Sequence, residues 1–127
     1  MSLNIVSIHH VAIICSDYSR SKHFYTEILG FEIISETYRA ERDSYKLDLR
    51  VGEKDQIELF SFLNRPARPS YPEARGLRHL AFAVDNLESQ ISKLTKYDIA
   101  VEPIRLDELT RQRFTYFQDP DGLPLEL

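Results

Sequence analysis

Cysteine is nearly absent from this chain of 127 residues, in which Cys15 stands alone. A single cysteine excludes an internal disulfide and any zinc site built from several thiolates. A basic tract is also missing and the net charge is −4, so neither nucleic acid nor an anionic membrane is an expected partner. No apolar run approaches the roughly 20 residues that a membrane span needs, and no basic segment at the N-terminus leads into a cleavable signal. These absences predict a cytoplasmic protein.

The length fits one compact domain spanning residues 1–127, and the apolar pattern divides it into two similar halves. We place module one at about 5–62 and module two at about 77–127. The connector between them, 63–76, contains prolines that prevent regular structure over most of its length. The halves are therefore expected to be two modules of a single domain.

Each module is predicted to be a strand, a helix and three further strands. In module one the first strand, 5–15, is so continuously apolar that it should be covered on both faces. A helix with apolar residues at helical spacing follows and ends at Gly30. The remaining strands are expected at 31–38, 44–51 and 56–62, and in module two the strands are expected at 77–84, 99–104, 113–118 and 123–127, with a helix from about Asn86.

Four residues repeat one pattern across the two modules, in which a histidine opens an apolar strand and a glutamate closes a later one. His10 and Glu58 are 48 positions apart, and His79 and Glu126 are 47 apart. Two neutral imidazoles and two carboxylates form a mixed nitrogen and oxygen ligand set suited to Zn, Ni, Co, Mn or Fe(II). The repeat therefore predicts a site for one divalent metal, whose identity the ligand types leave open.

The strand register adds two expectations about this site. Because side chains alternate along a strand, His10 should share a face with Ala12, and His9 should point to the opposite face. His79 has a comparable neighbour in Ala81, and such small residues leave room for a ligand. Taken singly, each of the four residues is better explained as a solvated edge residue or as the partner of an arginine. That explanation weakens for all four together, because two symmetric His/Glu pairs would have to arise for unrelated reasons.

Several cationic side chains are candidates for contacts with an anionic substrate. Lys46, Asp48 and Arg50 alternate with apolar residues and fit either the open side of the sheet or a solvated face. Four arginines could bind substrate carboxylates or carboxylates of the fold, and the sequence does not rank them: Arg39, Arg78, Arg111 and Arg113.

The motifs together resemble the vicinal oxygen chelate superfamily, which includes glyoxalase I, epimerases, dioxygenases, thiol transferases and bleomycin-resistance proteins. The resemblance covers essentially the whole chain. It rests on the segments His10–Ile13, Leu29–Phe31, His79–Phe82 and Asp119–Glu126. It implies an α+β fold in which two β-α-β-β-β modules form a cupped mixed sheet, and it implies a homodimer with a metal site that is completed within one chain or across two.

Within that superfamily, the bacterial type of glyoxalase I fills four ligand positions with His, Glu, His and Glu. His10, Glu58, His79 and Glu126 fill them here, so the resemblance implies a metal-dependent lyase or isomerase acting on the hemithioacetal of an α-ketoaldehyde. Glu126 would be the main base and Glu58 the symmetric alternative, with both also ligands. A CoA-ester epimerase, a thiol transferase and a non-enzymatic small-molecule binding protein remain open as alternatives.

Overall fold

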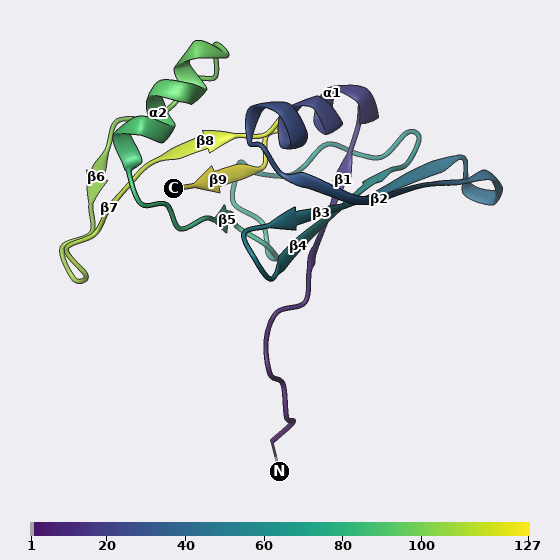
Figure 1. The fold of residues 1–127 in the computed structure, drawn as a ribbon, viewed down its shortest axis with the longest axis horizontal. Coiled ribbons are helices and arrows are strands. Elements are labelled where there is room, and N and C mark those ends of the chain that lie inside the picture. The colour runs from purple at the N-terminus through teal and green to yellow at the C-terminus, as the bar shows by residue number, and fades with distance from the viewer. Residues whose placement is uncertain (1) are drawn as a thin grey trace. The chain divides into compact units, whose positions relative to one another are not determined.

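The computed structural model describes residues 2–127, and the chain divides into two compact units (Figure 1). The first unit runs through Arg65 and the second begins at Pro66. Residues 62–79, which contain the predicted connector, form no helix or strand. Each unit is described by itself.

The first unit is a four-stranded mixed sheet with one helical segment. Its elements are β1 (Val11–Cys15), α1 (Tyr18–His23), a π-helical turn (Phe24–Ile28), β2 (Glu32–Arg39), a 3-10 turn (Ala40–Arg42), β3 (Ser44–Val51) and β4 (Asp55–Ser61). The strand order is β1-β4-β3-β2, with β1 parallel to β4 and the other neighbours antiparallel. The predicted β-α-β-β-β order is confirmed here.

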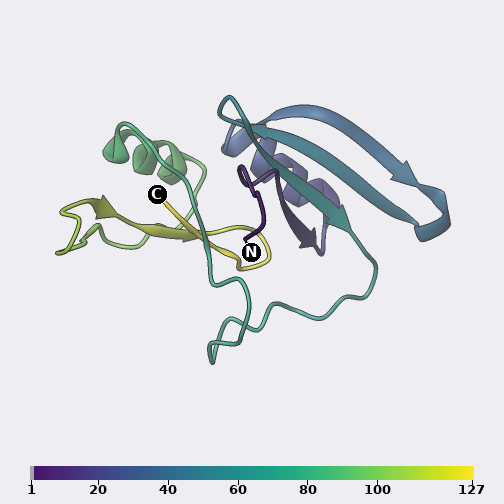
Figure 2. The same cartoon turned by 90° about the horizontal axis from the view of Figure 1, so that it is seen from below.

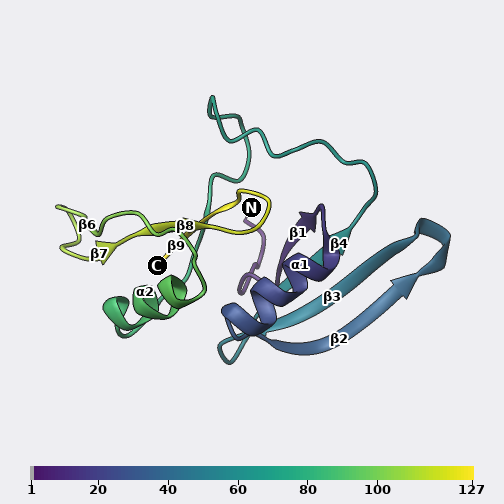
Figure 3. The same ribbon diagram turned by 90° about the horizontal axis from the view of Figure 1, so that it is seen from above.

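Local chemistry explains where the helical segment begins and ends. The carboxylate of Asp17 accepts a hydrogen bond from the backbone N–H of Arg20, which satisfies one of the free donors at the helix start. At the other end Gly30 has a φ of 80°, a left-handed conformation that glycine adopts without steric cost. Figure 2 shows this segment against one side of the sheet, and Figure 3 shows β2 and β3 as a long twisted pair.

The two faces of the first sheet differ in character because the strands alternate. Leu47, Leu49, Ile57 and Leu59 are almost fully buried and form the core with apolar residues of β1 and the helical segment. The intervening residues of β3 and β4, among them Glu58, point to the opposite face. The alternation therefore puts polar groups together on the face away from the helix.

An exposed cluster joins α1 to β2, and we call Tyr18, Lys22 and Glu36 the Glu36 cluster. The Lys22 ammonium lies 2.8 Å from the Glu36 carboxylate, and the Tyr18 hydroxyl donates a hydrogen bond to the same oxygen. Both hydrogen bonds lower the pKa of Glu36, and the one from Lys22 has the larger effect. Burial and the same carboxylate raise the pKa of Tyr18.

The second unit repeats the central strand arrangement of the first. Its elements are β5 (Leu80–Ala81), α2 (Leu87–Lys96), β6 (Arg105–Leu106), β7 (Arg113–Phe114), β8 (Tyr116–Gln118) and β9 (Pro124–Glu126). The order β5-β9-β8 has β5 parallel and β8 antiparallel to β9, as β1 and β3 are to β4. Strands β6 and β7 form a separate antiparallel pair.

A buried carboxylate shapes the turn that precedes β9. Asp119 is 5% exposed, and its Oδ1 accepts hydrogen bonds from the backbone N–H groups of Asp121 and Leu123, each at 2.9 Å. Gly122 has a φ of 85°. Because the turn sets the register of the hairpin, it also sets the position of Glu126 on β9.

Several predicted strands are shorter than expected. Residues 5–10 form no strand, and Ile5 and Val6 are 78% and 95% exposed. Of the run 5–15, only residues 11–15 pair with β4. An apolar run without a partner strand cannot satisfy its backbone groups as a sheet does. The expectation that 5–15 is covered on both faces is also wrong, since Ile14 is 54% exposed.

In the second unit the strand expected at 99–104 is absent, and β6 begins only at Arg105. The strand expected at 77–84 is reduced to β5, and the one expected at 113–118 is divided at Thr115 into β7 and β8. Thr115 still exchanges backbone hydrogen bonds with Leu127, so the pairing beside β9 continues past the end of the assigned strand. No helix in residues 2–127 has the length and apolar character to cross a membrane.

Candidate metal centre

The first His/Glu pair lies at the start of β1 and in the middle of β4. His10 Nε2 is 3.5 Å from Glu58 Oε2, and the side chain of the histidine is 38% exposed while that of the glutamate is 12% exposed. His10 directly precedes β1, and Glu58 pairs in register with Ala12. Parallel pairing of these two strands therefore brings the first predicted pair together.

The second pair has the same construction. His79 Nε2 is 3.2 Å from Glu126 Oε2, with side chains 28% and 22% exposed. His79 directly precedes β5, and Glu126 pairs in register with Ala81. In both units the glutamate thus lies opposite an alanine two positions beyond the histidine, and the repeat found in the sequence is a repeat in strand register.

The spacing within each pair fits two ligands of one metal ion. Imidazole nitrogens and carboxylate oxygens bind divalent metals at about 2.0–2.2 Å, so two such donors on neighbouring positions of one ion lie roughly 3.0–3.5 Å apart. Across residues 2–127 no group of three or more His, Cys, Asp or Glu side chains is placed to hold a metal. The described structure therefore supplies two half-sites of two ligands each.

His9 contacts His10, contrary to the prediction that the two point to opposite faces. Because both precede β1, strand alternation does not separate them, and their Nδ1 atoms lie 2.9 Å apart. One of these nitrogens must carry the hydrogen that joins them. Because Nδ1 of His10 is engaged by His9, Nε2 of His10 is left directed at Glu58. In metal sites, a hydrogen-bond partner on the second ring nitrogen holds a ligand histidine in orientation.

The surroundings of the two glutamates differ in charge. Lys46 Nζ lies 4.0 Å from Glu58 Oε1 and 3.6 Å from Asp48 Oδ1, and Asp48 pairs in register with Glu58. Lys46 and Asp48 therefore face the first half-site, which fits the prediction that they line the open side of the sheet. In the second unit, the position that corresponds to Asp48 is occupied by Tyr116, which pairs in register with Glu126.

Tyr116 links the second half-site to its neighbours. Its ring meets that of His79 edge to face, with centroids 5.3 Å apart. Burial and the charge of Glu126 raise the pKa of Tyr116, while the guanidinium groups of Arg78 and Arg105 act in the opposite direction. The tyrosine therefore stays protonated at neutral pH as a hydrogen-bond donor beside Glu126.

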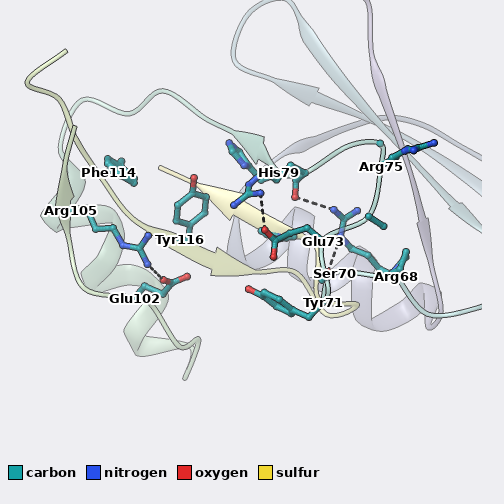
Figure 4. A pocket seen from close by; sticks show the side chains of 15 residues that line it. Arg68, Ser70, Tyr71, Glu73, Arg75, His79, Glu102, Arg105, Phe114 and Tyr116 are labelled. Carbon is teal, nitrogen blue, oxygen red and sulfur yellow. Dashed lines mark hydrogen bonds and ion pairs between the residues drawn. The ribbon is translucent and has the colours of Figure 1, made fainter. Parts of the chain in front are cut away.

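A pocket of about 550 Å³ opens beside this half-site, and all of its lining residues belong to the second unit (Figure 4). His79 and Tyr116 form part of its wall, and the predicted connector supplies another part, from Arg68 to Gly76. Arg68 holds the connector in place, because its guanidinium donates to Ser70 Oγ and to the backbone carbonyls of Leu77 and Arg78. The volume lies in the range typical of small-molecule sites.

The structure separates the four arginines that the sequence could not rank. Arg78 lines the pocket, whereas Arg113 pairs with Glu88 outside it and Arg39 stacks over the rings of Phe60 and Phe62. Arg111 takes no part in the pocket. Sequence reasoning missed the pocket residues of the connector and of the strands near it, namely Arg68, Arg75, Arg105, Phe114 and Tyr116. For Tyr116 alone the sequence held a usable indication, because it lies three positions before the turn that begins at Asp119 and pairs with Glu126 across that turn.

Comparison with known proteins identifies the family of this chain. The model of the glyoxalase/bleomycin resistance protein/dioxygenase superfamily matches residues 7–127, which include both His/Glu pairs. The chain belongs to this superfamily. Its members typically use a divalent metal, and they include enzymes such as glyoxalase I as well as resistance proteins that are not enzymes.

This chain is similar to several known proteins over nearly its whole length. YwkD of Bacillus subtilis is 60% identical over 95% of this chain and 94% of its own, and YaeR of Escherichia coli is 54% identical over 98% and 97%. A glyoxalase family protein from Enterococcus faecalis has a crystal structure with a TM-score of 0.88, at 52% identity over 95% of each chain.

Two more distant similarities bear on chemistry. The trypanothione-dependent glyoxalase I of Leishmania major is 25% identical, with a TM-score of 0.72, over 97% of this chain and 86% of its own. A 2-epi-5-epi-valiolone epimerase from Actinomyces sp is 28% identical over 96% of this chain and 78% of its own.

Proposed function

We propose that this protein is a metal-dependent lyase or isomerase of the glyoxalase I type, which moves a proton between neighbouring carbons of a hemithioacetal formed from an α-ketoaldehyde and a thiol. The observation that carries the proposal is the repeated half-site. Each unit presents one imidazole and one carboxylate at ligand spacing, on strands in equivalent register. The similarity to a glyoxalase I supports the same reaction class.

In this proposal His10, Glu58, His79 and Glu126 hold one divalent ion, with the two pairs contributed by one chain or by two copies in a homodimer. Four protein ligands leave open positions on a six-coordinate ion for the adjacent oxygens of a substrate. A divalent ion bound there would act as a Lewis acid that makes the neighbouring C–H bond more acidic. The remaining chemistry falls to the side chains around it.

Glu126 is the proposed proton carrier, removing a proton from one carbon and returning it to the next. Glu58 is the symmetric alternative. The Lys46 ammonium lies 4.0 Å from Glu58, whereas Tyr116 pairs in register with Glu126. The two half-sites are thus similar as ligand pairs and differ in the side chains beside each carboxylate.

An epimerase is the second candidate, supported by the 28% identity to the 2-epi-5-epi-valiolone epimerase. Epimerisation next to a carbonyl begins with the same proton removal, so the two reactions need nearly the same side chains. They differ in product, which is a rearranged hydroxy thioester for the lyase and the inverted substrate for the epimerase.

Proton exchange with solvent tests the proposal. Metal-loaded protein in deuterated water is mixed with methylglyoxal adducts of several thiols and, separately, with CoA thioesters, and the substrate C–H signal is followed by NMR. We expect loss of that signal and a hydroxy thioester product from at least one adduct, with the Glu126→Gln variant as the control. Exchange with inversion and no rearrangement would favour the epimerase, and an absence of exchange with every compound would favour a non-enzymatic binding protein.

A further inference from the structure

The pocket beside His79 has a lining with an excess of positive charge. Four arginines and two glutamates contribute to it, namely Arg68, Arg75, Arg78, Arg105, Glu73 and Glu102. The guanidinium of Arg68 donates only to uncharged oxygens of Ser70, Leu77 and Arg78, so no carboxylate of the lining offsets its charge. The glutamates can neutralise at most two of the four cations.

The two arginine–glutamate pairs of the lining lie in solvent. Arg78 is 3.4 Å from Glu73, with side chains 72% and 63% exposed, and Arg105 pairs with Glu102 at 55% and 49% exposure. Exposed ion pairs of this kind contribute little to stability. Either guanidinium can therefore exchange its glutamate for an anionic oxygen of a ligand at small cost.

Both of these arginines lie near the half-site, Arg105 beside Tyr116 and Arg78 next to His79 in the chain. The guanidinium of Arg105 lies 5.8 Å from the centre of the Tyr116 ring, and the Tyr116 ring in turn packs against His79. Arg78 adjoins His79 in the chain, and Figure 4 shows Tyr116 lying between His79 and Arg105. A molecule that reaches His79 with one end therefore meets guanidinium groups with the other.

We propose that this pocket binds the anionic end of the substrate, a carboxylate or a phosphate group, through Arg78 and Arg105. The inference rests on the proposed function for the identity of the reacting end, but the anion site itself does not depend on that chemistry. Apolar surface from Pro69, Phe114 and Pro124 lines the same pocket and suits the carbon chain that joins the two ends. The preferred substrate is then an anionic adduct rather than a neutral one.

Anion binding is measured first, on the protein as purified, by NMR titration with inorganic phosphate and, in a separate arm, with mercaptoacetate. The variants are Arg105→Gln and Arg78→Gln, and the matched control is Arg111→Gln, which removes the same charge from the same unit outside the pocket. Losing a charge-assisted hydrogen bond at a partly exposed site should weaken binding about 5- to 10-fold. The stronger of the two probes identifies whether phosphate or carboxylate is the preferred group.

The second arm compares kcat/KM for two methylglyoxal adducts that differ in charge and by one methyl group, those of mercaptoacetate and of its methyl ester. We expect the charged adduct to be preferred by about 10-fold in the wild type and in Arg111→Gln, and the preference to vanish in Arg105→Gln. Equal weakening of anion binding in the control and pocket variants, or no anion binding at all, would overturn the inference. Anion binding that depends on Arg105 in a protein inactive on every adduct would support the pocket and count against the proposed function.

Discussion

Replacing Asp119 with Ala tests how the turn between β8 and β9 holds Glu126 in place. The Asp119 carboxylate is 5% exposed and accepts two backbone N–H bonds through one oxygen. Removing it leaves two N–H donors without that acceptor in a buried setting, and each costs about 1–3 kcal/mol. Because the Asp121 N–H is only partly buried and can reach water, we expect the lower part of the summed range, a fall in the free energy of unfolding of about 2–4 kcal/mol.

Asp119→Asn is the matched control, because an amide retains an oxygen that can take the position of Oδ1, while it loses the charge and replaces Oδ2 with an NH2 donor. Urea unfolding of the two variants should show a much smaller loss for Asn than for Ala. The Ala variant should also bind metal more weakly, since a loosened turn releases the register that pairs Glu126 with Ala81. Unfolding of the Ala variant within about 0.5 kcal/mol of the wild type would refute this account of the turn.

Three further predictions concern the half-sites and the surface. His10→Ala should remove measurable metal binding, whereas His9→Ala, which removes only the Nδ1 contact, should weaken metal affinity about 10-fold. Calorimetry measures both affinities, and equal losses would contradict the assignment of His10 alone as the ligand. Glu126→Gln should lower kcat about 10²- to 10⁴-fold and Glu58→Gln should lower it less, and a fully active Glu126 variant would exclude this residue as the base. The Glu36 cluster should contribute up to about 1 kcal/mol to the free energy of unfolding at neutral pH. Because the pKa of Glu36 is lower in the folded than in the unfolded protein, this contribution is complete above the unfolded-state pKa and is lost as the pH falls through the folded-state pKa. Unfolding of wild type and Glu36→Gln should therefore converge in acid, and a constant difference would contradict this.

The pairing of histidine with glutamate was predictable because it depends on strand periodicity. A histidine at the start of an apolar run and a glutamate on a later run recur at nearly equal separation, and parallel pairing of the runs turns this recurrence into contact. The element order of the first unit followed from the apolar periodicity of the sequence, and the resemblance to the superfamily implied the α+β class. Register is strongly specified when one face of a sheet is buried, and a sequence displays that pattern directly.

Contacts made by irregular segments were not predictable in this way. The run at 5–10 has the composition of a strand, but whether it pairs depends on a partner that β4 does not provide. The connector was expected only to separate the modules, yet Arg68 folds it back through three hydrogen bonds to form the pocket wall. Neither outcome follows from periodicity, because both depend on which chain segment lies nearby. The contact between His9 and His10 escaped prediction for the same reason, since alternation applies only inside a strand.

Metal stoichiometry in single-pair variants tests most directly whether the two half-sites serve one ion. Purified wild type, His10→Ala and His79→Ala are loaded with Ni, Zn, Co, Mn or Fe(II) in turn, and bound metal per chain is measured by elemental analysis after removal of the excess. If all four residues hold the same ion, within one chain or across two, the wild type binds one ion per chain and either variant loses it. Two ions per wild-type chain, or one ion retained at undiminished affinity in either variant, would contradict a shared site.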